Sequence, residues 1–216
     1  MQEWSTATAS QMLWIVGAQE RRYPSSTSMI AASVIKSAIN ISIPVVHIFC
    51  DWPGKHEEKV VVNILYSMIC QLVDILPLKV ETSSDFSSAR FGNLDGSFQT
   101  WDEAISICAE LFLEVPSLLL VVIDGIEHVS LGTTRKNIES LLGVLNAHVS
   151  RLSKQGKSSN IFKVLFTTAG NCAALNRLGN QDLKIVKASL KSSKQGPGKF
   201  QPGMTELLLF NRERER

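Results

Sequence analysis

The chain has 216 residues, which is enough for one domain with a sizeable hydrophobic core and an appended tail. Hydrophobic residues make up 44% of it and charged residues 19%, proportions that exclude a disordered chain. The longest apolar run, Leu118–Ile123, is much shorter than the ~18 residues that a membrane span needs, so we expect no membrane partner.

The net charge of +2 is distributed unevenly along the chain. Residues 184–216 carry eight Lys or Arg and three Glu, whereas residues 1–183 carry fourteen Lys or Arg and seventeen Asp or Glu. A mildly acidic body with a basic tail lacks the recurring basic face of a nucleic-acid-binding domain. We therefore expect no nucleic-acid partner.

The cysteines and the N-terminus indicate the compartment. The four cysteines stand at wide, irregular spacings without a C-x-x-C pair, which favours reduced core cysteines over a disulfide frame or a zinc site. Residues 1–10, MQEWSTATAS, lack a basic segment followed by an apolar one, so the sequence indicates no secretory signal. We expect a cytoplasmic protein with no metal cluster and with a flexible N-terminus over residues 1–10.

Strands and helices alternate over residues 11–188, which is the pattern of a parallel sheet covered on both faces. The apolar segment Gln11–Gly17, closed by a glycine, is predicted as the first strand. After a loop, a helix is predicted to begin near Ser26 or Thr27, with a hydroxyl side chain as its N-cap, and to end near Asn40.

The middle of the chain continues this alternation. Pro44–Cys50 is predicted as a second strand, and helical spacing of apolar residues predicts a helix over Glu57–Leu76. Residues 78–97 are rich in Ser, Asp and Gly and are predicted as a surface connection, followed by a helix over Phe98–Val115. Leu118–Asp124 is apolar until its final carboxylate, which predicts a strand buried on both faces.

The last third of the domain is predicted in the same way. Thr134–Leu152 carries a helical apolar stripe, Phe162–Thr168 is a strand, and a short helix is predicted around Cys172–Leu178. Leu183–Ala188 is predicted as a fifth, weaker strand. Residues 189–216 are poor in apolar residues over most of their length and are predicted to form a basic, disordered tail.

Two of the predicted strands end in motifs that resemble those of P-loop NTPases. In LLLVVIDGIEH, an apolar strand ends in Asp124 and continues with glycine, an apolar residue and Glu127, which resembles the Walker B motif. The FKVLFTT strand resembles the sensor strand of these proteins, with Thr168 at its polar tip. Family members often continue there with arginine, whereas this chain has Ala169.

The order of these elements resembles the NACHT-like members of the signal-transducing STAND group. Taken together, QMLWIVG…YPSSTS, HIFCDWPG, VVIDGIEH and FKVLFTTAG resemble a group of filamentous-fungal proteins with a degenerate NTPase domain. The resemblance implies a three-layer α-β-α, P-loop NTPase-like sandwich over residues 11–188, with a mostly parallel five-stranded sheet. The implied order places Gln11–Gly17 between Leu183–Ala188 and Phe162–Thr168, with Leu118–Asp124 next and Pro44–Cys50 outermost.

The resemblance also implies roles for particular residues. Asp124 would hold Mg²⁺ through water, and Glu127 occupies the position of a catalytic acid. The residues implied to contact a bound Mg-ATP or ADP are Gly17, Ser26, Thr27 and Thr168.

The phosphate-binding loop departs from the family pattern. A working loop reads G-x-x-x-x-G-K-[ST], in which glycines let backbone N–H groups wrap the phosphates and lysine neutralises them. If Gly17 sets the register, Arg22–Pro24 stand where Gly, Lys and Ser/Thr belong. If the helix start sets it, Ser25–Thr27 fill those positions in a loop that is three residues longer. Both registers lack the second glycine and the lysine.

Three functions follow from this pattern. The missing lysine favours a pseudo-NTPase or regulatory scaffold, with weak or no nucleotide binding, no efficient hydrolysis and a protein partner on the α/β surface. The retained acidic residues leave two alternatives open, an ATP- or ADP-binding switch of the STAND type and an ATPase with an atypical loop. The sequence alone does not decide among them.

Overall fold

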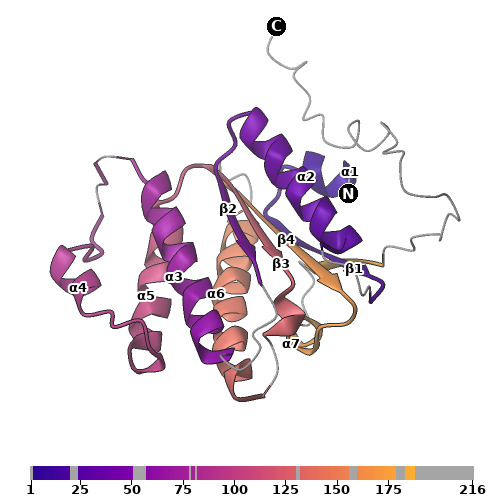
Figure 1. The fold of residues 1–216 in the computed structure, drawn as a ribbon. Helices are drawn as coiled ribbons and strands as arrows, with labels where there is room; N and C mark the ends of the chain where they lie inside the picture. The colour runs from indigo at the N-terminus through magenta and orange to yellow at the C-terminus, as the bar shows by residue number, and fades with distance from the viewer. Residues whose placement is uncertain are drawn as a thin grey trace, which may run out of the picture.

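The computed structural model describes residues 2–19, 24–50, 57–77, 79–80, 82–129, 132–155, 160–178 and 183–187. It is an α/β structure whose five strands form one all-parallel sheet in the order β2-β3-β4-β1-β5 (Figure 1). This order confirms the prediction, with β4 as the middle strand. The strands are β1 (Gln11–Gly17), β2 (Val45–Phe49), β3 (Leu118–Asp124), β4 (Ile161–Ala169) and β5 (Leu183–Lys187).

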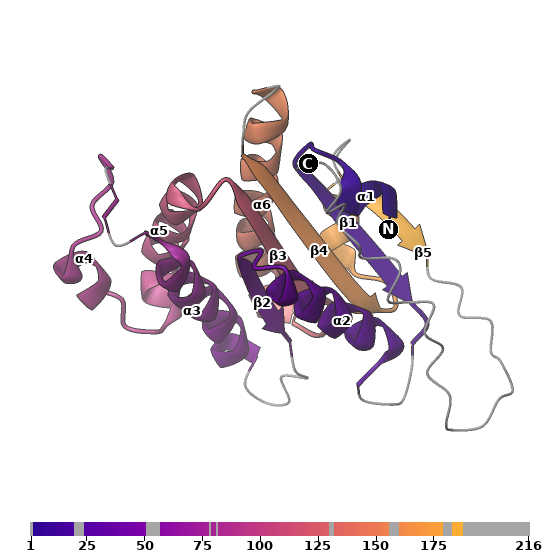
Figure 2. The same ribbon diagram turned by 90° about the horizontal axis from the view of Figure 1, so that it is seen from above.

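Helices cover both faces of the sheet and produce three layers. Figure 2 shows α2 on one face and α6 on the other. The α-helices are α1 (Gln2–Thr6), α2 (Ser26–Asn40), α3 (Glu57–Ile75), α4 (Ser88–Gly92), α5 (Trp101–Glu114), α6 (Arg135–Lys154) and α7 (Ala173–Arg177). Three short 3₁₀ segments lie at Phe98–Thr100, Ile126–His128 and Gly132–Thr134. Within the described residues, no helix is long and apolar enough to cross a membrane.

The two faces of the sheet bury different amounts of apolar surface. Alternate residues of β3 point to opposite faces, so Val121 and Ile123 pack with α3, α5 and α6 in the larger core. Leu120 and Val122 belong to the smaller core under α2, which also includes Trp4 of α1. The apolar composition of β3 follows from this arrangement, because neither face of the strand meets water.

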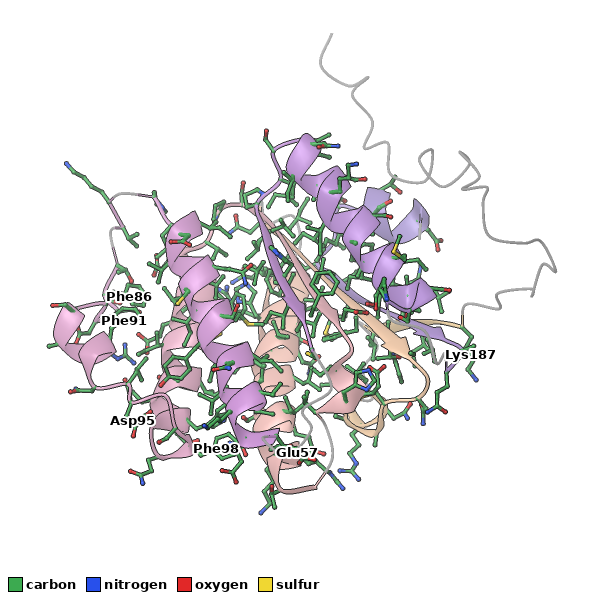
Figure 3. All side chains as sticks on the ribbon, viewed as in Figure 1. Glu57, Phe86, Phe91, Asp95, Phe98 and Lys187 are labelled. Atoms are coloured by element: carbon green, nitrogen blue, oxygen red, sulfur yellow. The ribbon has the colours of Figure 1, made fainter. Side chains whose placement is uncertain are left out.

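Two regions differ from the sequence prediction. Residues 1–10 were expected to be flexible, yet α1 lies there and the side chain of Trp4 is buried. The predicted connection over residues 78–97 contains α4, whose Arg90 pairs with Glu103 and Glu110 of α5. Figure 3 shows this region, marked by Phe86 and Phe91, on the opposite side of the molecule from Lys187. The predicted tail over residues 189–216 lies outside the described residues.

Candidate functional site

The predicted nucleotide site lies where the carboxyl ends of β1, β3 and β4 meet the first turn of α2. Parallel strands bring these ends to one edge of the sheet, where ligands of open α/β folds commonly bind. The helix begins at Ser26, as predicted, and Ser25 is its N-cap. The Oγ of Ser25 accepts a hydrogen bond from the backbone N–H of Ser28 at 3.0 Å.

Asp124, at the end of β3, is buried and hydrogen-bonded through both carboxylate oxygens. Its Oδ2 accepts from the hydroxyl of Ser28 at 2.6 Å, and its Oδ1 accepts from the hydroxyl of Thr167 at 2.6 Å. Both donors belong to this chain, one from α2 and one from β4. The carboxylate therefore lies in a polar cluster that compensates for its burial.

The hydroxyl groups at the start of α2 form a directed chain that ends on Asp124. A carboxylate oxygen only accepts hydrogen bonds, so the single hydroxyl hydrogen of Ser28 is donated in the hydrogen bond to Asp124. The Oγ atoms of Ser25 and Ser28 lie 2.9 Å apart, and Ser25 must donate in that pair. Thr27 in turn donates to Ser25 across 2.8 Å. We call Ser25, Thr27, Ser28, Asp124 and Thr167 the hydroxyl cluster.

Gly17 provides close contact between β1 and α2. A Cβ atom built on this glycine would lie 2.5 Å from the Cγ2 methyl of Thr27 and 3.4 Å from the carbonyl oxygen of Thr168. The end of the strand and the first turn of the helix therefore pack directly on each other. Thr27 therefore packs against Gly17.

The two threonines at the end of β4 point to opposite faces of the sheet, as alternation requires. Thr167 reaches Asp124, whereas Thr168 accepts from the indole N–H of Trp14 at 2.9 Å and donates to the carbonyl of Gly170 at 2.7 Å. Thr168, which the resemblance placed beside the nucleotide, is thus bonded within the larger core. Thr167 is the residue of this pair that lies in the cluster.

Glu127 follows Asp124 across a turn that only glycine adopts easily. Gly125 has φ of 77°, and a Cβ atom there would lie 2.7 Å from the carbonyl oxygen of Cys50. The turn carries Glu127 back toward β4, where its Oε1 accepts from the backbone N–H of Ala169 at 2.7 Å. Its Oε1 also lies 3.7 Å from Nε2 of His128.

The environment of Glu127 favours its neutral form. Burial raises the pKa of the Glu127 carboxyl above its ordinary value, and the negative charge of Asp124 raises it further. The hydrogen bond from Ala169 and the proximity of His128 act in the opposite direction. A carboxyl held in this way can take up a proton at a higher pH than an exposed glutamate.

The members of the cluster offer oxygen atoms, and no cation bonds to them among the described residues. Carboxylate and hydroxyl oxygens such as those of Asp124 and Ser28 are ligands that suit Mg²⁺. Phosphates, by contrast, need positive charge, and no described lysine or arginine pairs with or hydrogen bonds to a member of the cluster. Arg22 and Tyr23, which stand at the glycine and lysine positions in the loop register set by Gly17, lie outside the described residues.

Sequence reasoning selected Thr27 and Asp124 of the hydroxyl cluster and missed two other members, Ser28 and Thr167, by one position each. Gly17, Thr27 and Asp124 come together at the carboxyl edge, and Ser26 stands half-buried at the first position of α2. Ser28 and Thr167, which bond Asp124, were missed. Because residues 25–28 are all hydroxyl-bearing, the sequence gives no signal for which of them faces the carboxylate. For Thr167, alternation along β4 was the available signal, because it places Thr167 and Thr168 on opposite faces, so that only one of them can face Asp124.

Comparison with protein families gives a match over most of the chain. Residues 1–168 match the family model described as Nephrocystin 3, N-terminal, which therefore covers more than half of the chain. A search of the curated proteins finds no relative that matches.

Proposed function

We propose, from the premise that the chain belongs to the nephrocystin 3 N-terminal family, that it contains a degenerate P-loop NTPase-like domain of the NACHT-like type. The domain acts as a pseudo-NTPase or regulatory scaffold, with weak or no nucleotide binding and no efficient hydrolysis. The parallel sheet supports this relationship, as does the position of Asp124 at a strand end beside the start of α2.

The hydroxyl cluster is the observation that carries the proposal. Each oxygen of Asp124 already accepts a strong hydrogen bond from this chain, and Ser25, Thr27 and Ser28 bond one another. A nucleotide with Mg²⁺ would have to break these bonds to bind. The cost of breaking them is offset in working NTPases by a lysine that neutralises the phosphates, and the sequence has no lysine in this loop.

Efficient hydrolysis requires a cation to stabilise the negative charge that develops on the transferring phosphoryl group. Among the described residues, the side chains that bond Asp124 at this end of the sheet are the hydroxyls of Ser28 and Thr167. These hydrogen bonds between hydroxyls and a carboxylate of the same chain are therefore suited to stabilising the ends of the strands.

The partner of such a scaffold is a protein. Exposed apolar side chains on and just after α2 support this, namely Met29, Ile39 and Ile41.

A regulatory ATP or ADP switch is the second candidate. The hydroxyl oxygen of Ser28 and the carboxylate of Asp124 lie together as a pair of ligands suited to Mg²⁺. In this function the nucleotide would replace the internal bonds of the cluster, and the first turn of α2 would move with it.

Titration calorimetry with ATP and ADP in the presence of Mg²⁺, together with a hydrolysis assay, tests the proposal. We expect binding to be weak or undetectable and hydrolysis to stay at background. Substantial hydrolysis by the unmodified protein, abolished in Asp124→Asn, would overturn the pseudo-NTPase assignment. Tight binding without hydrolysis would favour the switch.

A loop repair tests the register that the structure indicates. Since Ser28 bonds Asp124, Ser26 and Thr27 stand where glycine and lysine precede the hydroxyl residue of a working loop. The double variant Ser26→Gly/Thr27→Lys should therefore gain affinity for Mg-ATP. The matched control Ser25→Gly/Ser26→Lys, which follows the register set by the helix start, should gain less. A larger gain in the control would show that Thr27 occupies the position assigned to Ser28.

A further inference from the structure

A pocket lies at the opposite end of the sheet from Asp124, and we call it the amino-end pocket. It is bounded by α1 and the residues after it, by the second half of α2, and by the first residues of β3 and β4. The pocket has a volume of about 490 Å³, within the roughly 300–1,000 Å³ typical of small-molecule sites.

The walls of the amino-end pocket are mainly apolar, with one cation among them. The apolar side chains come from α2, from the strand starts and from Ile43: Val34, Ala38, Ile43, Leu118, Leu120 and Ile161. The cation is Lys163, the third residue of β4, which is only 5% exposed. The neighbours of Lys163 on this face of β4, Ile161 and Leu165, are apolar, so a lysine here is costly unless its charge is used.

The described residues satisfy the Lys163 ammonium only in part. Its Nζ donates to the backbone carbonyl of Trp4 at 2.9 Å and lies 5.6 Å from the centre of the Trp4 ring. An ammonium has three N–H donors, and among the described residues no carboxylate pairs with this one. The neighbouring charge is another cation, Lys184, which itself pairs with Glu3 at 2.6 Å.

We propose that the amino-end pocket binds a small amphipathic carboxylate, with its apolar chain between α2 and the strand starts and its carboxylate on Lys163 Nζ. The apolar walls match the apolar part of the ligand, and the partly compensated ammonium matches its charge. A carboxylate here would add a charged acceptor to the Trp4 carbonyl, in a low-dielectric position where such a bond is strong. This site is independent of the hydroxyl cluster and of the function proposed for it.

Binding of decanoate to the full chain, measured by titration calorimetry, tests the proposal. We expect saturable binding at a one-to-one ratio, at least tenfold tighter than the binding of decan-1-ol or decylammonium, because only the carboxylate pairs with the ammonium. The fluorescence of Trp4 should change with the same midpoint, since its ring lies in the pocket wall. If decanoate does not bind, or if the alcohol or the amine binds as tightly, the proposal is wrong.

Three variants locate the site. Lys163→Met keeps the length of the side chain and removes the charge, so decanoate affinity should fall at least tenfold while decan-1-ol affinity should hold. Ser37→Trp fills the pocket from α2 and should abolish the binding of both ligands. Lys184→Met is the control, because it removes the neighbouring cation and should change decanoate affinity less than threefold.

Unchanged decanoate affinity in Lys163→Met, or a large loss of affinity in Lys184→Met, would overturn the assignment of the carboxylate to Lys163. Retained affinity in Ser37→Trp would place the ligand outside the pocket, and circular dichroism shows whether each variant folds.

Discussion

Two buried charges lie on the α2 face of the sheet, one at each end of its strands. Asp124, at the carboxyl end, accepts two short hydrogen bonds from hydroxyls of its own chain. Lys163, at the amino end, donates to one backbone carbonyl and borders a pocket of about 490 Å³. The chain has thus compensated for the charge at the end where the family resemblance implies a ligand. It has left the charge partly uncompensated at the other end, and that difference separates a structural cluster from a candidate binding site.

The largest effect should come from removing the carboxylate of the hydroxyl cluster. Asp124→Ala leaves the hydroxyls of Ser28 and Thr167 without their acceptor in a buried site, which should cost about 3–4 kcal/mol of unfolding free energy. In Asp124→Asn the amide can donate to Ser28, and the hydroxyl chain can reverse toward Thr27, so the loss should be much smaller. Urea denaturation of both variants gives the comparison. An equal loss in the two would mean that the chain cannot reverse.

A somewhat smaller effect is expected from the turn that follows Asp124. Gly125→Ala places a Cβ atom 2.7 Å from the Cys50 carbonyl at a φ of 77°, and should cost about 2–4 kcal/mol. Gly96 is the matched control, because its φ of 72° is similar and nothing lies within 4 Å of the added atom. Gly96→Ala should cost only about 1 kcal/mol. Thermal unfolding of both variants separates the cost of backbone strain from the cost of the steric clash. Equal losses of stability in the two variants would contradict the role of close packing at Gly125.

The sequence predicted the carboxyl end of the sheet better than the amino end. Long apolar runs and helical spacing set the strands and the major helices, because burial of their faces dominates the energy. The segments that it missed are short. In each of these segments one side chain makes the tertiary contacts, Trp4 in α1 and Arg90 in α4, and one side chain leaves no periodic pattern in the sequence. Lys163 was available as a signal, since it is a lone charge inside the apolar run FKVLF, but only the structure shows that the residue faces a pocket.

The charge on Lys163 should lower stability at neutral pH. Burial, together with the positive charge of Lys184, lowers the pKa of Lys163 to about 8. Between about pH 8 and 10.5 the unfolded chain therefore binds more protons than the folded one, and the stability contributed by this residue rises with pH. Without added ligand, Lys163→Met should be more stable than the parent at pH 7 by on the order of 2 kcal/mol, and the gap should narrow by pH 10.

Urea denaturation at pH 7 and pH 10 measures this difference. Lys36→Met, which removes an exposed lysine from α2, is the control and should show no such change with pH. If the stability advantage of Lys163→Met over the parent grows toward pH 10, the folded protein stabilises the Lys163 ammonium. In that case the comparison with Asp124 would fail, because both charges would be compensated by the chain itself.

The smallest effect concerns Glu127, which lies beside Asp124 but outside the hydroxyl cluster. Its pKa is raised by burial and by Asp124, so the folded state favours its proton. The stability that it contributes is therefore fully present below its unfolded pKa of about 4.5 and is lost as pH rises through the higher folded value. Glu127→Gln keeps an oxygen that can accept from Ala169 N–H and removes the buried charge. The variant should be more stable than the parent by up to about 1 kcal/mol at pH 8, and the two should converge near pH 4. Urea denaturation at both pH values checks this. If the parent instead gains stability relative to the variant as pH rises, the hydrogen bond from Ala169 N–H to the carboxylate, at 2.7 Å, outweighs the cost of its burial.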